Sequence, residues 1–342
     1  MIGRSFIIQT YRTLTALLEP AAAGLLLWRR RRGKEDPARL SERRGHPSIE
    51  RPTKTLVWLH GASVGETVTL LPLIERLQQR RGLAVLVTSG TVTSARLLAQ
   101  RLPAGAIHQF LPLDVPRYMR RFLDHWRPDL GLICESEIWP NLMIEAGKRS
   151  VPLVLVNARM SERSFRRWYK FPQTSRYLLS GFDRCLAQSQ EDGQRLAQLG
   201  APRVSIAGNL KFDVPAPPAD PNTLALLDGL AAGRPVWVAA STHPGEEEDV
   251  LAAHLGVTTH LPKLLTIVVP RHPDRGAEVE ALAQANDVAS ARRSLGHLPE
   301  RDIDFYIADT LGDLGLFYRL APVAFIGGSL APIGGHNPIE PA

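Results

Sequence analysis

A glutamate closes the stretch LVWLHGASVGE, residues 56–66, where an apolar run turns through glycines into the start of a helix. A carboxylate at the tip of a buried strand could act as a general base. It could equally complete the hydrogen bonding of the helix start. In either role the positive end of the helix dipole should favour the charged form, so we expect Glu66 to be ionised.

Two more carboxylates follow another apolar run. Glu135 and Glu137 come directly after DLGLIC, residues 129–134. In parallel sheets ligands bind beyond the carboxyl ends of the strands, so both side chains could reach a ligand there. Either could instead be the buried partner of an arginine. Cys134 has no evident base beside it and is interpreted as a small buried hydrophobic residue.

In the second half of the chain, polar residues follow four apolar runs in succession. They are Ser241 and His243 in STHPGEEE, Arg271 and His272 in PRHP, the segment ADTLGDL, and Gly334, Gly335, His336, Asn337 and Glu340 in GGSLAPIGGHNPIEPA. Glycines before a helix let backbone N–H groups approach a phosphate. Singly, each has a plainer explanation: Arg271 could form a salt bridge, and a glycine pair could turn the chain. The histidines lack the spacing of metal ligands, so we expect no metal.

A basic and aromatic stretch lies between these halves. From Arg159 to Arg176 the chain has six basic residues and one acidic residue, interleaved with Phe165, Trp168, Tyr169 and Phe171. Arginines recognise phosphate groups, and aromatic side chains sit at the level of lipid headgroups. A solvated basic helix face explains the pattern as well, and RNA binding is a weaker third explanation.

Short apolar runs alternate with helix-length segments along the chain. The strands and helices that they predict must position the candidate residues. TLVWLH, AVLVTS, DLGLICE and PLVLVNA are typical of buried parallel strands in a doubly wound sheet. The pattern stops at four prolines between residues 215 and 221, and resumes with PVWVAAST, LLTIVVPRH, DFYIADT and PVAFIGGS. We therefore predict an α/β protein with two Rossmann-like domains facing each other across a cleft, the second with four visible strands.

The net charge of the chain is confined to its beginning. Of the formal charge of +7, all is carried by residues 1–54, with 12 basic and 5 acidic residues. This distribution argues against a general nucleic-acid binder and favours contact with an anionic surface. Two cysteines provide neither a disulfide framework nor a zinc site.

Residues 6–28 are apolar enough to enter a membrane, but Arg12, Glu19 and Pro20 interrupt them. Spanning needs about 20 predominantly apolar residues, so an interfacial anchor is the better interpretation. The arginines at 29–32 would place its end on the cytoplasmic side. A cleaved signal peptide fits less well, because charge should precede the apolar run. The alternative is a helix packed on the first domain.

Eight motifs in order resemble the 3-deoxy-D-manno-octulosonic acid (Kdo) transferases of lipopolysaccharide assembly. They are HGASVGE, ESEIWPN, NARMSERS, GNLKFD, STHPGEEE, PRHP, ADTLGDL and FIGGSLAPIGGHNPIEPA. The resemblance implies a GT-B glycosyltransferase fold, CMP-Kdo as donor and the lipid A precursor (lipid IVA, the tetraacyldisaccharide 4'-bisphosphate) as acceptor. It also implies an inverting reaction on the cytoplasmic face of the inner membrane, with no metal and no other cofactor, and no nucleic-acid partner.

The same resemblance assigns roles by position. Glu66 corresponds to the general base, and Gly61 and Gly65 would leave room for a sugar ring. Acceptor contacts are implied for Ser63, Gly65, Glu135, Glu137, Arg159 and Arg163. Donor contacts are implied for Lys211, Ser241, His243, Arg271, His272, Gly334, Gly335, His336, Asn337 and Glu340. Two positions depart from the family pattern. Pro244 stands where the family has an acidic residue, and Asp313 stands where it has a glutamate.

The predicted organisation has four parts. Residues 1–45 form the membrane anchor and basic segment, 46–210 the acceptor-binding domain, 211–222 the linker, and 223–342 the CMP-Kdo-binding domain. Because the sequence stops within a motif, the second domain is expected to be truncated. A GT-B enzyme that uses a UDP-sugar and an inactive nucleotide-binding remnant are the alternatives. The number of Kdo residues added and the oligomeric state stay open.

Overall fold

The computed structural model describes residues 6–214, 216–332 and 335, and the chain divides into two compact units, Met1–Val214 and Pro215–Ala342. Each unit is a parallel α/β fold, as the alternation of strands and helices predicts. The division falls at 214/215, after a short 3₁₀ helix, η3 (Leu210–Asp213). Lys211, expected in the linker, therefore belongs to unit 1.

Unit 1 is built on a seven-stranded parallel sheet with the order β3-β2-β1-β4-β5-β6-β7. Its strands are β1 (Thr55–Gly61), β2 (Leu83–Ser89), β3 (Ile107–Phe110), β4 (Leu130–Cys134), β5 (Leu153–Ala158), β6 (Arg184–Ala187) and β7 (Val204–Ile206). The order reverses between β1 and β4, because the chain winds outward in both directions from β1. Such a reversal opens a crevice at the carboxyl ends of the two strands.

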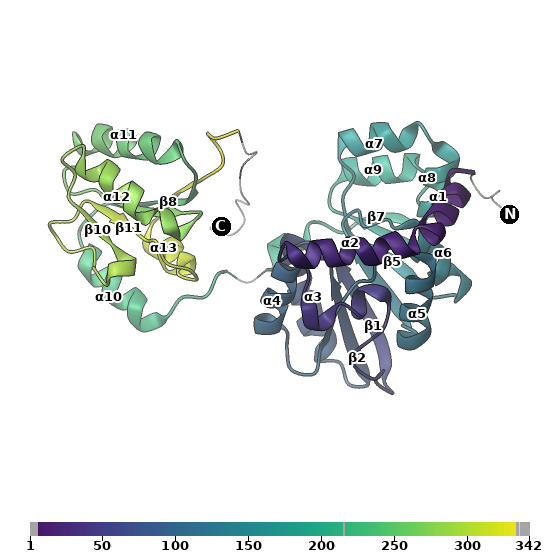
Figure 1. The fold of residues 1–342 in the computed structure, drawn as a ribbon. Helices are drawn as coiled ribbons and strands as arrows, with labels where there is room; N and C mark the ends of the chain where they lie inside the picture. Colours follow the sequence, from purple (N-terminus) through teal and green to yellow (C-terminus); the bar gives the residue numbers. More distant parts are fainter. Residues whose placement is uncertain (1–5, 215, 333–334, 336–342) are drawn as a thin grey trace. The chain divides into compact units, whose positions relative to one another are not determined.

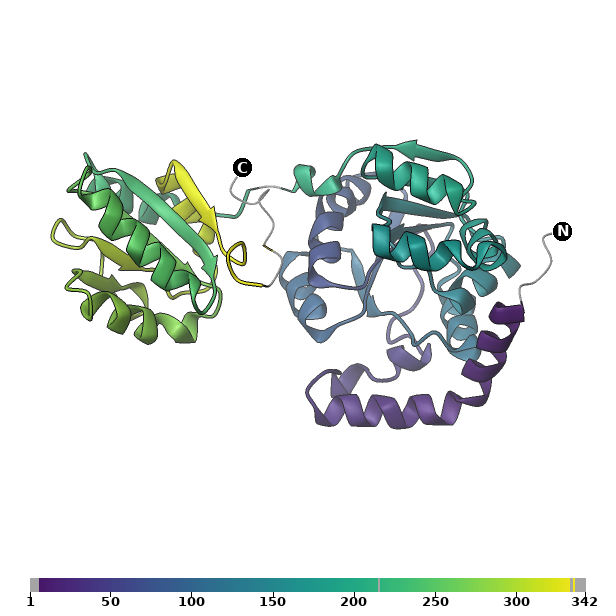
Figure 2. The ribbon, with the colours of Figure 1, turned by 90° about the horizontal axis from the view of Figure 1, so that it is seen from above.

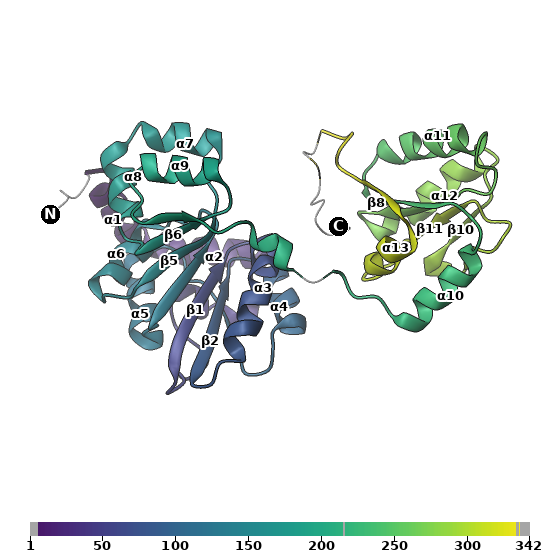
Figure 3. The same ribbon diagram turned by 180° about the vertical axis from the view of Figure 1, so that it is seen from behind.

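Helices cover both faces of this sheet (Figures 1 and 3). The bounds are α3 (Val64–Gln78), α4 (Val92–Arg101), α5 (Pro116–Trp126), α6 (Pro140–Lys148), α7 (Glu162–Tyr169), α8 (Pro172–Leu179) and α9 (Gln190–Gln198). Side chains of β1 alternate between two cores. Leu56 and Trp58 pack with α5, α6 and α8, whereas Val57 and Leu59 pack with α3 and α4.

Trp58 illustrates why the sheet is stable. Its ring is fully buried and meets Phe122 of α5 edge-on, with 5.2 Å between ring centroids. Its indole N–H donates to Thr88 Oγ1 of β2 at 2.9 Å, so no polar atom of the ring is left unpaired. Burial of a side chain of this size stabilises the fold by about 2–3 kcal/mol.

Residues 6–45 pack by one face on the rest of unit 1. They form α1 (Phe6–Leu17), α2 (Glu19–Arg31) and the 3₁₀ helices η1 (Pro37–Arg39) and η2 (Glu42–Arg44), which run along one side of the unit (Figure 2). Ile8 and Leu26 are buried, while Tyr11 donates to Asp114 and Arg12 pairs with Glu145. The remaining face exposes apolar side chains. The packed helix and the exposed apolar surface, weighed as alternatives, therefore coexist.

Unit 2 has a five-stranded parallel sheet in the order β10-β11-β9-β8-β12. The strands are β8 (Val236–Thr242), β9 (Leu265–Pro270), β10 (Ser290–Arg292), β11 (Phe305–Ile307) and β12 (Val323–Ile326). The expectation of four strands was wrong by one. β10 was missed because it is a three-residue edge strand, Ser-Ala-Arg, without the apolar run of a buried strand.

Helices sandwich this second sheet as well. They are α10 (Pro221–Ala231), α11 (Glu246–Thr258), α12 (Gly276–Gln284) and α13 (Leu314–Leu320), with the 3₁₀ turns η4 (Pro273–Arg275) and η5 (Arg293–Leu295). The helices α10 and α13 share a core with Val238 and Ile267, whereas α11 and α12 pack against Ala239 and Val268 on the other face. The order reverses between β8 and β12, again creating a crevice at the carboxyl ends.

Candidate active site

Some of the polar residues predicted from the sequence lie at the two strand-order reversals. In unit 1, Glu66 follows β1. Glu135 and Glu137 follow β4, the strand that pairs with β1. In unit 2, Ser241 lies near the end of β8, and Gly327 follows β12, the strand that pairs with it. Each unit thus carries its candidate residues where an open parallel sheet can admit a ligand.

Glu66 lies in the first turn of α3 and closes a capping arrangement. Its backbone N–H donates to Ser63 Oγ at 3.3 Å, and the Ser63 hydroxyl donates to Glu66 Oε1 at 2.7 Å. Glu66 Oε2 accepts the backbone N–H of Ala62 at 2.9 Å. The carboxylate therefore completes the helix start, one of its two possible roles. A carboxylate has about four acceptor sites, so two remain for a substrate hydroxyl.

The helix start is not the only influence on the ionisation of Glu66. Burial raises the pKa of Glu66 above its ordinary value. The hydrogen bonds from Ser63 and Ala62 oppose this rise, but the negative charges of Glu137 and Glu135 add to it. Desolvation and like charge therefore outweigh these two hydrogen bonds. A raised pKa makes the carboxylate a stronger base, which a proton-abstracting role requires.

The two glutamates after β4 are held differently. Glu135 adopts a left-handed backbone with φ of 55°, an uncommon conformation for a residue with a side chain. Glu137 accepts the indole N–H of Trp139 at 2.7 Å and has His60 Nε2 at 3.9 Å. Burial alone would raise the pKa of Glu137, yet His60 and Trp139 together hold it below its ordinary value.

His60 belongs to the site, although it was not predicted from the sequence. It is 1% exposed in β1, and its Nδ1 lies 3.0 Å from Thr88 Oγ1. Its Nε2 faces Glu137 and has no hydrogen-bond partner among the described residues. A histidine within an otherwise apolar strand was the available signal, because an imidazole buried in a strand needs polar partners.

Lys211 is the basic residue beside these carboxylates. Its Nζ lies 3.4 Å from Glu135 Oε1, and η3 brings it there within unit 1. Glu135 thus has a lysine partner, where an arginine was one alternative. Gly61 does not leave space for a ligand, because an added Cβ would lie 3.1 Å from Glu66 atoms of the first turn of α3. At Gly65 an added Cβ would meet nothing within 4 Å, so that position is open.

The basic and aromatic stretch forms α7, α8 and the turn between them. Arg159 and Arg163 are exposed, and a surface hollow of about 560 Å³ is lined by Glu162, Arg163, Arg166, Arg167 and Lys170. Phe165 and Trp168 pack against the core, whereas Tyr169 and Phe171 are exposed. Only two of the four aromatic side chains are therefore available to a lipid surface.

In unit 2 the structure brings four predicted donor residues to the ends of β8 and β9. Ser241 has a left-handed backbone with φ of 58°, and the rings of His243 and His272 lie 6.3 Å apart. Arg271 is exposed, and its N–H donates to the Thr242 carbonyl at 2.9 Å. Gly335 donates to the Gly328 carbonyl at 2.7 Å. Gly334, His336, Asn337 and Glu340 lie outside the described residues.

Glu246 organises this end of unit 2, and the sequence reading did not single it out. It is 1% exposed at the start of α11. Its Oε2 accepts from His243 N at 3.0 Å and Gly328 N at 2.8 Å. Its Oε1 accepts from Leu330 N at 3.0 Å and Ala331 N at 3.3 Å. One carboxylate thereby joins the loop after β8 to the loop after β12.

These four N–H donors decide the ionisation of Glu246. Burial alone would raise its pKa, but the bonds from Gly328, Leu330, His243 and Ala331 hold the pKa below its ordinary value. Hydrogen bonds to the charged form favour that form. Four acidic residues follow HPG in the sequence, which signals a helix start. The donors 82–85 residues away could not be predicted from the sequence.

The family is decided by sequence comparison. Residues 38–214 match the sequence model of the family described as "3-Deoxy-D-manno-octulosonic-acid transferase (kdotransferase)". A protein of Arabidopsis thaliana described as a probable mitochondrial 3-deoxy-D-manno-octulosonic acid transferase is 38% identical, over 98% of this chain and 78% of its own length. The chain belongs to the Kdo transferase family. It is therefore a glycosyltransferase by family.

Solved structures are similar to this Kdo transferase family member in two ways. The C-terminal CMP-Kdo binding domain of WaaA from Acinetobacter baumannii is 41% identical in sequence, over 35% of this chain and 64% of that domain, with a TM-score of 0.34. UDP-GlcNAc 2-epimerase from Neisseria meningitidis is 12% identical, over 79% of this chain and 76% of its own, with a TM-score of 0.51. The second likeness shows the GT-B-like fold alone.

The described residues hold no group of three or more His, Cys, Asp and Glu arranged to bind a metal ion. Cys134 is buried, and burial raises the pKa of its thiol, so it is not an activated nucleophile.

Proposed function

We propose that this Kdo transferase family member moves Kdo from CMP-Kdo to the lipid A precursor, lipid IVA, with Glu66 as the general base. The observation that carries the proposal is the Glu66 carboxylate itself. It is positioned by Ser63 and Ala62 at the reversal between β1 and β4, and burial and two neighbouring carboxylates raise its pKa. Family membership supplies the transferred sugar, Kdo.

In the proposed step, Kdo passes from CMP to the acceptor hydroxyl with inversion. Glu66 takes the proton from an acceptor hydroxyl while that oxygen forms a bond to the anomeric carbon of Kdo. The bond from this carbon to the phosphate oxygen breaks on the opposite face, and CMP leaves with the electron pair. Attack on the face opposite the leaving group inverts the anomeric carbon, and Glu66 ends the step protonated.

The other candidate residues act on charge and position. Lys211 offers an ammonium group beside Glu135 for an anionic group of the donor. Arg271, exposed at the end of β9, is suited to balance the charge that develops on the leaving phosphate. Glu246 takes no part in the chemistry of this scheme, but it holds the loops of Ser241, His243 and Gly328 in place. The Acinetobacter baumannii domain, which is 41% identical to part of this chain and binds CMP-Kdo, supports CMP-Kdo as donor.

We propose contact with a membrane surface through the first two helices. In the described part of the chain, none of the helices has the length and apolar character to cross a membrane. However, large apolar side chains are exposed on both helices, including Phe6 at 81% and Leu17 at 72% in α1 and Trp28 at 47% in α2. An apolar face next to arginines is the pattern of an interfacial helix on anionic lipid. The cytoplasmic face of the inner membrane is the proposed location.

The decisive experiment is product analysis by mass spectrometry with CMP-Kdo and lipid IVA. The proposal expects lipid IVA to gain the mass of Kdo while CMP is released. UDP released from a UDP-sugar, with no CMP from CMP-Kdo, would contradict the donor assignment. Substituting a zwitterionic monoacyl acceptor tests the acceptor separately, because Kdo transfer to it at an equal rate would contradict lipid IVA.

A further inference from the structure

A second hollow lies on unit 1, apart from the candidate site. Its volume is about 370 Å³, within the range of small-molecule sites. Residues from α1, from the second half of α6 and from the end of α8 and the turn after it form its wall. They are Ile8, Gln9, Arg12, Met143, Ile144, Gly147, Lys148, Tyr177, Ser180 and Gly181.

The floor of this hollow is apolar and its rim is cationic. Ile8 and Met143 belong to the buried core, and Ile144 packs against it. At the rim, Arg12 has a buried Nη1 atom without a hydrogen-bond partner among the described residues, and the Lys148 side chain is half exposed. An apolar floor with cations at its edge suits an anionic amphiphile.

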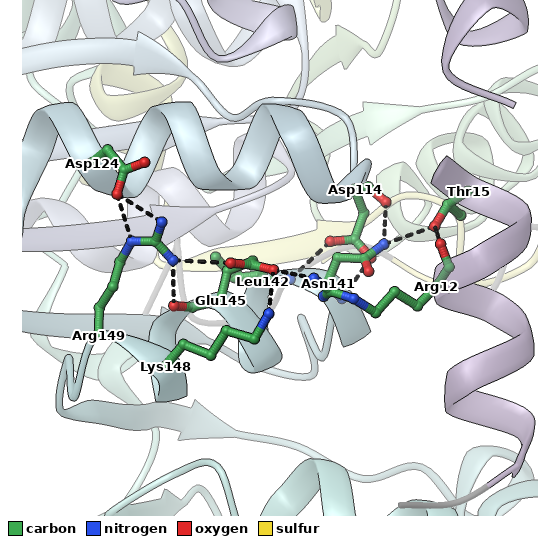
Figure 4. Close-up of polar contacts among 9 residues, drawn as sticks. All are labelled: Arg12, Thr15, Asp114, Asp124, Asn141, Leu142, Glu145, Lys148 and Arg149. Atoms are coloured by element: carbon green, nitrogen blue, oxygen red, sulfur yellow. Dashed lines mark hydrogen bonds and ion pairs between the residues drawn. The ribbon is translucent and has the colours of Figure 1, made fainter. Parts of the chain in front are cut away.

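The charges around the hollow do not cancel. Arg12, Lys148 and Arg149 all converge on the buried carboxylate of Glu145 (Figure 4). Asp124 takes a second bond from Arg149 at 2.6 Å. Three cations therefore face two carboxylates, and the excess positive charge lies with Arg12 and Lys148, the two residues that line the hollow.

The direction of α6 separates this hollow from the chemistry. In a parallel sheet the helix after β4 begins near the carboxyl ends of the strands and runs back toward their amino ends. Pro140 is at its start, near the glutamates, and Lys148 is at its end. Eight residues of helix correspond to about 12 Å. The end of the hollow at Lys148 therefore lies away from the strand ends that carry the candidate site.

We propose that this hollow, here called the α1–α6 pocket, binds an anionic phospholipid of the bilayer. Its phosphate lies between Arg12 and Lys148, and the beginning of one acyl chain lies on Ile8 and Met143. The bilayer is the source because the exposed apolar side chains Phe6 and Leu17 belong to α1, the same helix that forms one wall. The pocket would thus fix the anchor helix through a shared lipid. This proposal does not depend on the Kdo transfer reaction.

Gly147 allows the pocket to be filled without disturbing the fold. It lies in α6, and a Cβ added there would meet no atom within 4 Å. Gly147→Phe therefore projects a ring into the pocket. Gly256 in α11 of unit 2 is equally open, so Gly256→Phe is a matched control. Lys148→Gln removes the rim charge of a half-exposed side chain and leaves the volume unchanged.

Native mass spectrometry of residues 1–342 released from vesicles of equal phosphatidylglycerol and phosphatidylcholine tests the proposal. We expect one retained phosphatidylglycerol per chain, in at least tenfold excess over phosphatidylcholine. Gly147→Phe should lose at least nine tenths of it, Gly256→Phe should retain it, and Lys148→Gln should reduce the preference for phosphatidylglycerol. Full retention by Gly147→Phe at an unchanged melting temperature would overturn the proposal. So would an unchanged lipid preference in Lys148→Gln, even if Gly147→Phe failed to fold.

Discussion

Each unit places a glutamate at the start of the helix after its first strand, and the two carboxylates differ in ionisation. Glu66 accepts two hydrogen bonds, both from within four residues, and its pKa is raised by burial and by neighbouring carboxylates. Glu246 is more deeply buried but accepts four backbone N–H bonds, and its pKa is lowered. A helix start alone therefore does not determine ionisation. Burial, the number of hydrogen-bond donors and the neighbouring charges together determine it.

Glu66 and Glu246 are therefore suited to different roles. A carboxylate with spare acceptor capacity and a raised pKa can take a proton, whereas one saturated by N–H groups stabilises loops. Turnover and stability, measured in matched variants, separate these two roles.

The largest effect is expected for Glu66→Gln. Glutamine cannot accept a proton, so turnover with CMP-Kdo and lipid IVA should fall by about a hundredfold or more. The free energy of unfolding should change little, because the amide can keep one of the two local bonds. Steady-state kinetics and urea denaturation give both values. Turnover within a few fold of the wild type would refute the base assignment.

For Glu246→Gln we expect the reverse pattern. The amide NH₂ would oppose two of the four backbone donors, so unit 2 should lose about 2–4 kcal/mol of stability. The KM for CMP-Kdo should rise more than kcat falls, because the loops around Ser241 and Gly328 lose their tie. Glu248→Gln, at an exposed neighbouring position, is the control. An unchanged urea midpoint in Glu246→Gln would show that the four bonds do not stabilise the loops.

The lowered pKa of Glu246 also predicts how the stability of the fold changes in acid. Because the pKa of Glu246 is lower in the folded state, its contribution to stability is complete above the unfolded pKa and is lost as pH falls through the folded pKa. Glu246→Gln should therefore show a shallower loss of stability in acid than the wild type. Urea midpoints across the acid range measure this, and an equal slope in both proteins would count against the assignment.

For activity, the acid limb of kcat/KM should lie above the ordinary pKa of a glutamate, because Glu66 must be deprotonated to act. Glu137→Gln removes one of the charges that raise the pKa of Glu66, so the limb should move to lower pH. Glu75→Gln, exposed later in the same helix, should leave it in place. A limb that stays fixed in Glu137→Gln would disprove the proposed coupling.

The smallest effect is expected for Ser63→Ala. Loss of the helix cap should reduce stability by about 1 kcal/mol. Turnover should fall only modestly, because Ala62 still holds one carboxylate oxygen. Ser63→Thr keeps a hydroxyl at the cap and should restore most of the stability, as thermal unfolding can show.

Much of the fold could be predicted because buried parallel strands are continuous apolar runs. The same logic located Glu66, Glu135 and the Ser241 region, since polar residues directly after such runs stand at carboxyl ends. The edge strand β10 escaped because its sequence, Ser-Ala-Arg, carries no apolar signal.

What could not be predicted depends on residues distant in sequence. The raised pKa of Glu66 arises from burial and, in addition, from carboxylates about 70 residues away. The role of Glu246 arises largely from N–H groups beyond residue 327. The docking of α1 depends on Asp114 and Glu145, which no local pattern connects with it. In each case the fold creates the environment that sets the chemistry.

The most direct test is a ¹³C NMR titration of the glutamate side-chain carboxyl carbons, with signals assigned by Glu66→Gln and Glu246→Gln. We expect Glu66 to titrate above the ordinary range for glutamate and Glu246 to titrate below it. If Glu66 titrated at or below the ordinary value, or if both glutamates titrated together, the proposed division between a proton acceptor and a loop support would be contradicted.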